Sequence, residues 1–155
     1  METAFLSKRP QYKTEVARII FERFHLDERR KGTFKETVKF FSQSGITGYP
    51  ITMIALKGGK CVGTVSIYRN DLPERPAYQP WLAALYVLPD FRGQGVADRL
   101  VRDMLNHLSG LGYETIYAKT QTQSRYDYYM QKGWELLETV DVDGRDNYIF
   151  RKRND

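Results

Sequence analysis

The segment Arg92–Ala97, RGQGVA, carries the clearest chemical signal in this sequence. An apolar run, Trp81–Leu88, precedes it, and a segment with helical periodicity follows. A strand, a glycine-rich turn and a helix start in this order bring unpaired backbone N–H groups together, and the helix dipole adds positive potential there. Glycine lets a phosphate come close to the backbone, and Arg92 adds a charged donor. These residues therefore predict a site for a diphosphate-bearing cofactor.

Two other phosphate-binding motifs do not fit this segment. A P-loop requires Gly-Lys-Ser/Thr after its glycines, and the dinucleotide fingerprint requires G-x-G-x-x-G after a strand. Neither pattern occurs here. A third interpretation needs no ligand, because glycine in a strand-to-helix turn can serve the tight turn alone.

Three motifs resemble those of the GNAT superfamily of acetyl-coenzyme A-dependent N-acetyltransferases. RGQGVA fits the pattern Q/R-x-x-G-x-G/A, and V-x-P-x-x, Val87–Phe91, precedes it as usual. Tyr129–Trp134 resembles the Y-x-x-x-G-F/W that ends a helix in this superfamily. Asp71–Pro76 followed by Pro80–Ala83 is similar to one broad prokaryotic-type group. Together the resemblance covers nearly the whole chain.

The resemblance implies an α+β fold with a mixed, mostly antiparallel central sheet flanked by helices. The strand before the glycine turn and the strand after the long helix would run parallel and splay apart, and the gap would admit the pantetheine arm of acetyl-CoA. The N–H of Leu85 would polarise the thioester carbonyl, since a fixed donor stabilises developing negative charge. The implied cofactor-binding residues are Leu85, Tyr86, Val87, Arg92, Gly93, Gln94, Gly95, Val96, Ala97, Thr122 and Tyr129.

Tyr129 is the candidate catalytic residue, because its place four residues before Gly133 matches the superfamily's general-acid tyrosine. When an amine attacks a thioester, the departing thiolate needs a proton. A tyrosine with an ordinary pKa of about 10 stays protonated at neutral pH and can donate that proton. Tyr126 and Tyr128 lie nearby, but Tyr128 points about 100° away on the helix, and we expect it to pack inward.

The sequence departs from the superfamily pattern in two places. Thr122 and Arg125 stand where many members have Asn and Ala, although Thr122 can still donate a hydrogen bond to the cofactor arm. No carboxylate lies in Trp81–Ala84, where some members place a glutamate base. The proton of the amine must then leave through water or through a loop carboxylate, for which Asp71 and Glu74 are the candidates.

Cys61, the single cysteine, is a poor candidate nucleophile. It lies inside a predicted strand, and a reactive thiol needs a nearby base or helix end. We therefore expect a buried structural thiol and direct attack of the amine on the thioester. His25 and His107 are isolated in sequence, so no metal site is predicted, and His25 is the weakest candidate base.

The hydrophobic periodicity predicts the elements that hold these residues. A helix follows Pro10, and Thr33 with Glu36 forms the capping box of a second helix. Residues 70–80 are expected to form a proline-rich surface connection. The other predicted elements are strands at Ile51–Leu56, Cys61–Tyr68, Trp81–Leu88 and Thr115–Lys119, helices at Val96–Leu108 and Arg125–Lys132, and a closing antiparallel pair at Trp134–Val142 and Asn147–Arg151.

Composition limits the class of protein. With 155 residues, 41% hydrophobic and 28% charged, the chain is expected to be a single soluble domain spanning 1–155. No apolar run approaches the ~20 residues of a membrane span, and neither a signal peptide nor a disulfide is predicted, which favours the cytoplasm. The net charge is +5, but only Arg29–Lys31 and Arg151–Arg153 form clusters, so no nucleic-acid partner is expected.

The expected function is N-acetyl transfer from acetyl-CoA to a primary amine. The alternative is a non-catalytic acyl-CoA-binding or sensor module, and a nucleic-acid-associated protein is a third reading. The acceptor, a small molecule or a peptide, stays open, as do an acyl group longer than acetyl and the choice between monomer and homodimer.

Overall fold

The computed structural model describes residues 1–24 and 32–154. Within this part of the chain, one seven-stranded sheet has the order β1-β2-β3-β4-β5-β7-β6. β4 and β5 form its parallel pair, and the other neighbours are antiparallel, which confirms the expected α+β fold. The strands are β1 (Glu2–Phe5), β2 (Ile51–Lys57), β3 (Lys60–Tyr68), β4 (Trp81–Val87), β5 (Thr115–Thr120), β6 (Glu135–Val142) and β7 (Arg145–Arg153).

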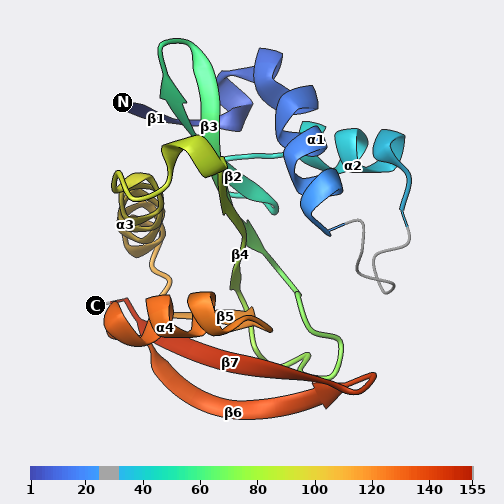
Figure 1. Cartoon of the computed structure of the whole chain (residues 1–155), viewed down its shortest axis with the longest axis vertical. Helices are drawn as coiled ribbons and strands as arrows, with labels where there is room; N and C mark the ends of the chain where they lie inside the picture. Colours follow the sequence, from blue (N-terminus) through green and yellow to red (C-terminus); the bar gives the residue numbers. More distant parts are fainter. Residues whose placement is uncertain (25–31, 155) are drawn as a thin grey trace.

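Helices cover both faces of this sheet (Figure 1). The paired helices α1 and α2 lie on one face, and α3 lies on the other. α4 covers β5 and β7, on the same face as α3. The helices are α1 (Lys13–Phe24), α2 (Phe34–Ser42), α3 (Val96–Gly110) and α4 (Gln123–Gln131), with short 3-10 turns at Leu6–Lys8, Pro10–Tyr12 and Pro89–Phe91.

Local signals in the sequence explain several element ends. The predicted capping box is present: Thr33 Oγ1 accepts from the Glu36 N–H at 3.1 Å, and the Glu36 carboxylate accepts from the Thr33 N–H at 3.4 Å. β2 and β3 form an antiparallel hairpin, and the expected closing pair, β6 and β7, is also present.

The predicted element order lacks β1, which the structure shows at the edge of the sheet. Four residues carry too little alternation to mark a strand. β1 forms because it pairs with β2, for example Ala4 with Ile54. Its Thr3 hydroxyl also donates to Asp103 on α3 at 2.6 Å. The strand therefore depends on tertiary contacts, which cannot be predicted from its own four residues.

α3 packs on the sheet through one apolar face, on which Leu100, Met104 and Leu108 are fully buried. The helix comes closest to β3 at Gly63. A Cβ at this position would lie 3.0 Å from Val96 Cγ1 and 3.2 Å from Leu100 Cδ1. The absence of a side chain here therefore sets how near the N-terminal end of α3 lies to the sheet.

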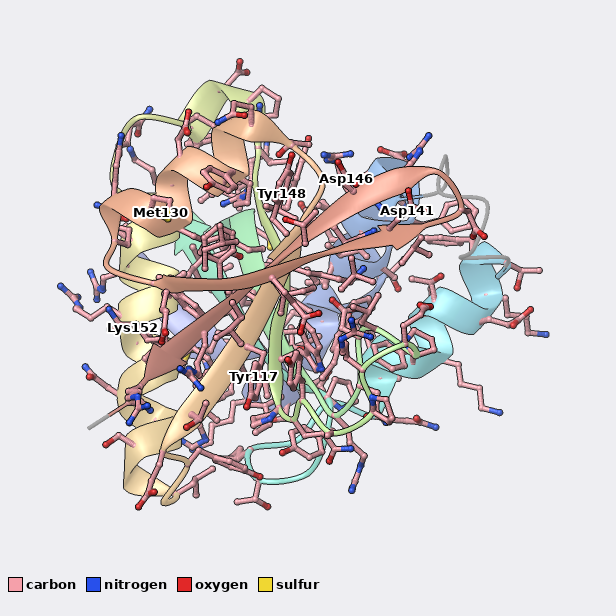
Figure 2. The ribbon with its side chains drawn as sticks, turned by 90° about the horizontal axis from the view of Figure 1, so that it is seen from below. Tyr117, Met130, Asp141, Asp146, Tyr148 and Lys152 are labelled. Atoms are coloured by element: carbon pink, nitrogen blue, oxygen red, sulfur yellow. The ribbon has the colours of Figure 1, made fainter. Side chains whose placement is uncertain are left out.

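The buried side chains form separate clusters on the two faces. One lies under α3 and α4, and a second lies under α1 and α2. A third, which contains Leu72, Trp81 and Ile149, lies under the loop between β3 and β4. Figure 2 shows Tyr148 beside α4 and Tyr117 beside this loop, on opposite sides of β7.

No helix in residues 1–24 and 32–154 is both long enough and apolar enough to cross a bilayer. The predictions made for His25 and for Arg29–Lys31 fall outside the described residues.

Candidate active site

The turn after β4 leads directly into α3. Gly93 has φ +73°, and Gly95, the N-cap of α3, has φ +80°. Side chains strain this left-handed conformation, so glycine is the residue it favours. The first bond of the helix runs from the Arg99 N–H to the Gly95 carbonyl at 3.0 Å. The amides of residues 95–98 therefore have no acceptor within the helix and lie at the positive end of its dipole.

A cleft of about 350 Å³ opens in front of this turn. A Cβ placed on Gly95 would have no heavy atom within 4 Å, so the backbone itself forms this wall. Free amides and nearby cations suit a diphosphate group. The cleft is lined by Val87, Phe91, Arg92, Gly93, Gly95, Val96, Ala97, Asp98, Arg125, Tyr128, Gln131 and Lys132.

A second groove, of about 570 Å³, continues from the cleft along α3. The two share Gly95, Asp98, Tyr128 and Lys132 as lining residues. The groove adds three cationic side chains, those of Arg99, Arg102 and Lys152. Positive charge therefore extends from the N-terminal end of α3 into the groove, where these three side chains carry it.

β4 has an open edge beside this cleft. Its one register partner on β5 is the pair Trp81–Tyr117, so the two strands separate beyond Trp81. The Leu88 N–H donates to Val62 on β3, which turns the backbone groups of Val87 toward the other edge. An extended ligand can therefore pair with this edge of β4 in the place that a neighbouring strand would occupy.

A bulge in β4 shapes the same edge. Thr64 pairs with Tyr86 and Ser66 with Ala83, so one residue of β3 faces two of β4. Ala84 adopts φ +52° there, a conformation that costs a non-glycine residue roughly 1–2 kcal/mol. The bulge turns the backbone of Leu85 to the open edge.

Two arginines bind the carbonyl oxygens on this edge. Arg125 Nη2 donates to the Leu85 carbonyl at 3.3 Å, and Arg92 Nε donates to the Val87 carbonyl at 2.9 Å. The carbonyls are thus satisfied by side chains from α4 and from the glycine turn. Arg125, where many members of the superfamily have alanine, therefore bridges α4 and β4.

Three other predicted cofactor residues have local roles. Gln94 donates to the Asp90 carbonyl at 3.2 Å and accepts from Lys57 at 3.0 Å, which ties the turn to the β2–β3 hairpin. The backbone of Tyr86 pairs with β3, so it lies off the open edge. The hydroxyl of Thr122 accepts from the Arg125 N–H at 3.4 Å and caps α4.

Tyr129, on α4, has 3% of its surface exposed and is not among the residues that line the cleft or the groove. Its ring centroid is 5.1 Å from that of Trp134 and 5.3 Å from that of Phe150. Its hydroxyl forms no hydrogen bond within the part of the chain that the structure describes. Burial is the main cause that raises the pKa of Tyr129 to about 12. The positive charge of Arg125 lowers this pKa, and the negative charge of Asp71 raises it further. The phenol therefore keeps its proton at neutral pH.

The expectation that Tyr128 packs inward is wrong. Tyr129 is the buried neighbour, and Tyr128 lines both the cleft and the groove. The Tyr128 hydroxyl donates to Asp98 at 3.0 Å, and Lys132 donates to the same carboxylate at 3.0 Å. Partial burial opposes ionisation of Asp98, but these two hydrogen bonds outweigh it and lower its pKa. Burial and then Asp98 raise the pKa of Tyr128, so its hydroxyl proton serves this hydrogen bond.

The two candidate bases in the β3–β4 loop differ in position. Asp71 is half-buried, and its charge adds to the increase in the pKa of Tyr129. Glu74 is exposed and does not contribute to that pKa. The two candidates thus differ in burial, and the choice of base stays open.

Cys61 is fully buried in β3, and burial raises its pKa to about 12. Its thiol therefore stays protonated at neutral pH, which is unsuited to nucleophilic attack. Among the described residues, no group of three or more His, Cys, Asp or Glu side chains is arranged to hold a metal ion.

Comparison with known proteins decides the family. The sequence model of the acetyltransferase (GNAT) family matches residues 14–133. The chain belongs to the GNAT acetyltransferase family. Enzymes of this family use acetyl-CoA as their cosubstrate. An N-alpha-acetyltransferase MAK3 of Arabidopsis thaliana is 27% identical to this GNAT chain over 75 residues, which are 48% of the chain and 38% of the relative. The chain thus spans well under two thirds of that relative's length.

Solved structures share the GNAT fold over nearly the full chain. An aminoglycoside 6'-N-acetyltransferase complexed with coenzyme A has a TM-score of 0.76 at 14% identity, with 99% of this chain and 97% of that chain covered. The Salmonella typhimurium protein yncA, solved with its cofactor acetyl-CoA, has a TM-score of 0.78 at 14% identity, with 100% and 94% covered. An N-acetyltransferase from Staphylococcus aureus Mu50 has a TM-score of 0.75 at 14% identity, with both chains fully covered.

Proposed function

We propose that this protein is an N-acetyltransferase that moves the acetyl group of acetyl-CoA to a primary amine by direct attack, with Tyr129 as the general acid. The chain from β1 to β7 acts as one domain in this proposal, because its sheet includes strands from both ends of the described chain. A cytoplasmic location, predicted from the single cysteine, is part of the same proposal.

One observation carries the proposal: the free amides of residues 95–98 and the end of β4 at Val87, on its open edge, line a single cleft. The amides suit a pyrophosphate. The open strand edge suits an extended arm with amide groups, because such an arm can form the hydrogen bonds of a missing strand. Coenzyme A combines these two chemical features.

The residues of the chain then have distinct tasks. The amides of Gly95, Val96 and Ala97 would hold the pyrophosphate, and the backbone of Val87 would align the arm. The N–H of Leu85 would stabilise the negative charge that develops on the carbonyl oxygen during attack. Acetyl-CoA supplies the activated acetyl group as a thioester. The new N–C bond forms as the C–S bond breaks, and Tyr129 gives its proton to the departing sulfur.

An amine as the acceptor is supported by the relatives. The names of the Arabidopsis thaliana protein and of the aminoglycoside enzyme both specify acetylation on nitrogen. The first name specifies an alpha nitrogen and the second the 6'-nitrogen of an aminoglycoside, so the class of amine stays open.

The experiment is a screen of primary amines with acetyl-CoA, in which the free thiol of coenzyme A is measured. We expect release that depends on the amine and an N-acetylated product of the corresponding mass. Calorimetry on the same preparation measures binding of coenzyme A. Binding without turnover for any amine would support the sensor module, and absence of binding would contradict both functions.

A further inference from the structure

Two carbonyl oxygens on the open edge of β4, those of Leu85 and Val87, accept hydrogen bonds from arginine side chains. Within residues 1–24 and 32–154, the register of β4 with β5 consists of the Trp81 pair, so β5 supplies no N–H group to these oxygens. Arg125 Nη2 lies 3.3 Å from the Leu85 oxygen, and Arg92 Nε lies 2.9 Å from the Val87 oxygen. In a sheet, the donor at such a position belongs to the neighbouring strand. The two arginines therefore take the place of a strand along this edge.

Each of these arginines has a second contact that holds it beside the cleft. The Arg92 guanidinium carbon lies 5.2 Å from the centroid of the Tyr86 ring. The Arg125 guanidinium carbon lies 5.5 Å from the centroid of the Tyr128 ring. Both arginines line the cleft. An extended ligand that enters the cleft and pairs with β4 thus meets both side chains at the edge.

The cationic side chains of the cleft differ in their partners. Lys132 pairs with Asp98 at 3.0 Å. Arg92 and Arg125 form no ion pair within the part of the chain that the structure describes. A guanidinium bound to a neutral carbonyl gains by exchanging it for a phosphate oxygen, because Arg–phosphate hydrogen bonds join two charged groups and are often bidentate. Arg92 directly precedes the glycine turn, so a phosphate at that turn can accept its hydrogen bond.

We propose that Arg92 and Arg125 keep the open edge of β4 closed until coenzyme A binds, and that the arm of coenzyme A displaces both side chains. This inference rests on the proposed function, in which the thioester lies at Leu85 and the diphosphate at the glycine turn. Arg92 then moves its hydrogen bond from the Val87 carbonyl to a phosphate oxygen. Arg125 has no phosphate at its end of the arm, so its release from the Leu85 carbonyl opposes binding.

The two arginines therefore have opposite effects on the affinity for coenzyme A. A ligand that pairs with the edge binds only the fraction of molecules in which the edge is free, and its affinity is reduced by that fraction. Arg92 offsets this reduction through its bond to the diphosphate, whereas Arg125 does not. Arg125 thus limits how readily the thioester end of the arm reaches the N–H of Leu85.

The test uses coenzyme A and pantetheine, which has the same arm without any phosphate. For Arg125→Ala we expect the dissociation constant of pantetheine to fall about 10-fold, as for an edge that is closed in about nine-tenths of the molecules. For Arg92→Ala the two ligands should respond in opposite directions. Pantetheine should bind about 10-fold more tightly, and coenzyme A at least about 10-fold more weakly, because the contact with the phosphate is lost. Titration of ¹⁵N-labelled protein measures both affinities, including millimolar ones.

A control variant and a second readout complete the test. Arg145, the first residue of β7, lines neither the cleft nor the groove. Arg145→Ala also removes one positive charge, and both affinities should stay within about 2-fold. In the wild type, the Arg92 Nε–H donates to Val87, and its exchange with solvent should become faster when pantetheine is bound.

The possible failures are distinguishable. Pantetheine binding that is unchanged, weaker or absent in Arg125→Ala would overturn the inference, as would an Arg92 Nε–H that exchanges equally slowly with and without pantetheine. Failure of the wild type to bind coenzyme A would instead contradict the proposed function.

Discussion

The two sides of the split between β4 and β5 are built in different ways. On the side of the cleft, the site consists of backbone groups from one continuous segment, residues 85–98, which is bent by a bulge and by two left-handed glycines. On the opposite side lies the β3–β4 loop, which is anchored by side-chain contacts to β5 and β6 more than 30 residues away.

This difference explains why the first side can be recognised from the sequence more easily than the second. A backbone site needs glycine at fixed positions, so it leaves a short and recognisable pattern. A side-chain site depends on how distant segments meet, and its residues can change with the acceptor. The first side therefore identifies the family, and we expect the second side to vary with the acceptor. The predictions below change one side at a time.

The largest effect is expected from Gly95→Leu. The side chain would enter the cleft and block the amides, each of which contributes roughly 1.5–3 kcal/mol as a hydrogen bond to a charged group. Coenzyme A affinity measured by calorimetry should fall at least about 100-fold. Gly112→Leu is the matched control, because Gly112 also has a left-handed φ, +89°, and an open Cβ position. Both variants should lose roughly 1–2 kcal/mol of stability, but only Gly95→Leu should lose binding.

Tyr129→Phe should affect turnover and leave binding unchanged. Loss of a general acid typically lowers the rate by 10² or more, and the ring contacts with Trp134 and Phe150 are kept. Steady-state kinetics should therefore show kcat reduced about 100-fold, with coenzyme A affinity within about 2-fold of wild type. Tyr126→Phe on the same helix is the control. Equal turnover in the two variants would remove Tyr129 from the mechanism.

Glu138→Gln is expected to weaken the attachment of the β3–β4 loop to β6, where Arg75 of the loop pairs with Glu138. It weakens the anchor of the β3–β4 loop, and an ion pair that is 30–36% exposed contributes at most about 1 kcal/mol. The acceptor kcat/KM should fall about 5-fold, and coenzyme A affinity should not change. Glu135→Gln is the control, since Glu135 lies on β6 as Glu138 does but pairs with Arg151 on β7, at 2.7 Å. A loss of coenzyme A affinity in Glu138→Gln would show that the two sides are not separable.

Thr33→Ala should have the smallest effect on activity. It removes the capping box of α2, which typically contributes about 1 kcal/mol to stability. Chemical denaturation should detect this loss, whereas coenzyme A binding should be unchanged because α2 lies on the face opposite α3. Thr37→Ala, one turn later, should cost less. A change in coenzyme A affinity for Thr33→Ala would contradict the separation of the faces.

Much of the fold could be predicted from sequence because its signals are local. The stripe on α3, the Thr33 capping box and the glycine turn each depend on residues a few positions apart. β1 could not be predicted, since it forms through pairing with β2. The bulge at Ala84 was equally hidden, because alanine is not a residue that marks a left-handed conformation.

Within the site, the limits of prediction follow the same rule. The order of Tyr128 and Tyr129 on α4 depends on where Asp98 and Trp134 lie in space. Spacing alone assigned the inward position to the wrong tyrosine. The bridge from Arg125 to the Leu85 carbonyl joins residues 40 positions apart, and no local pattern marks it.

The most direct test of the central claim is a titration with coenzyme A followed through the backbone amide resonances of ¹⁵N-labelled protein. If the first amides of α3 grip the pyrophosphate, the signals of Gly95, Val96 and Ala97 should move strongly, while those of Gly110 and Gly112 at the far end of the helix stay in place. Saturable binding that leaves the first three signals unmoved would contradict the account.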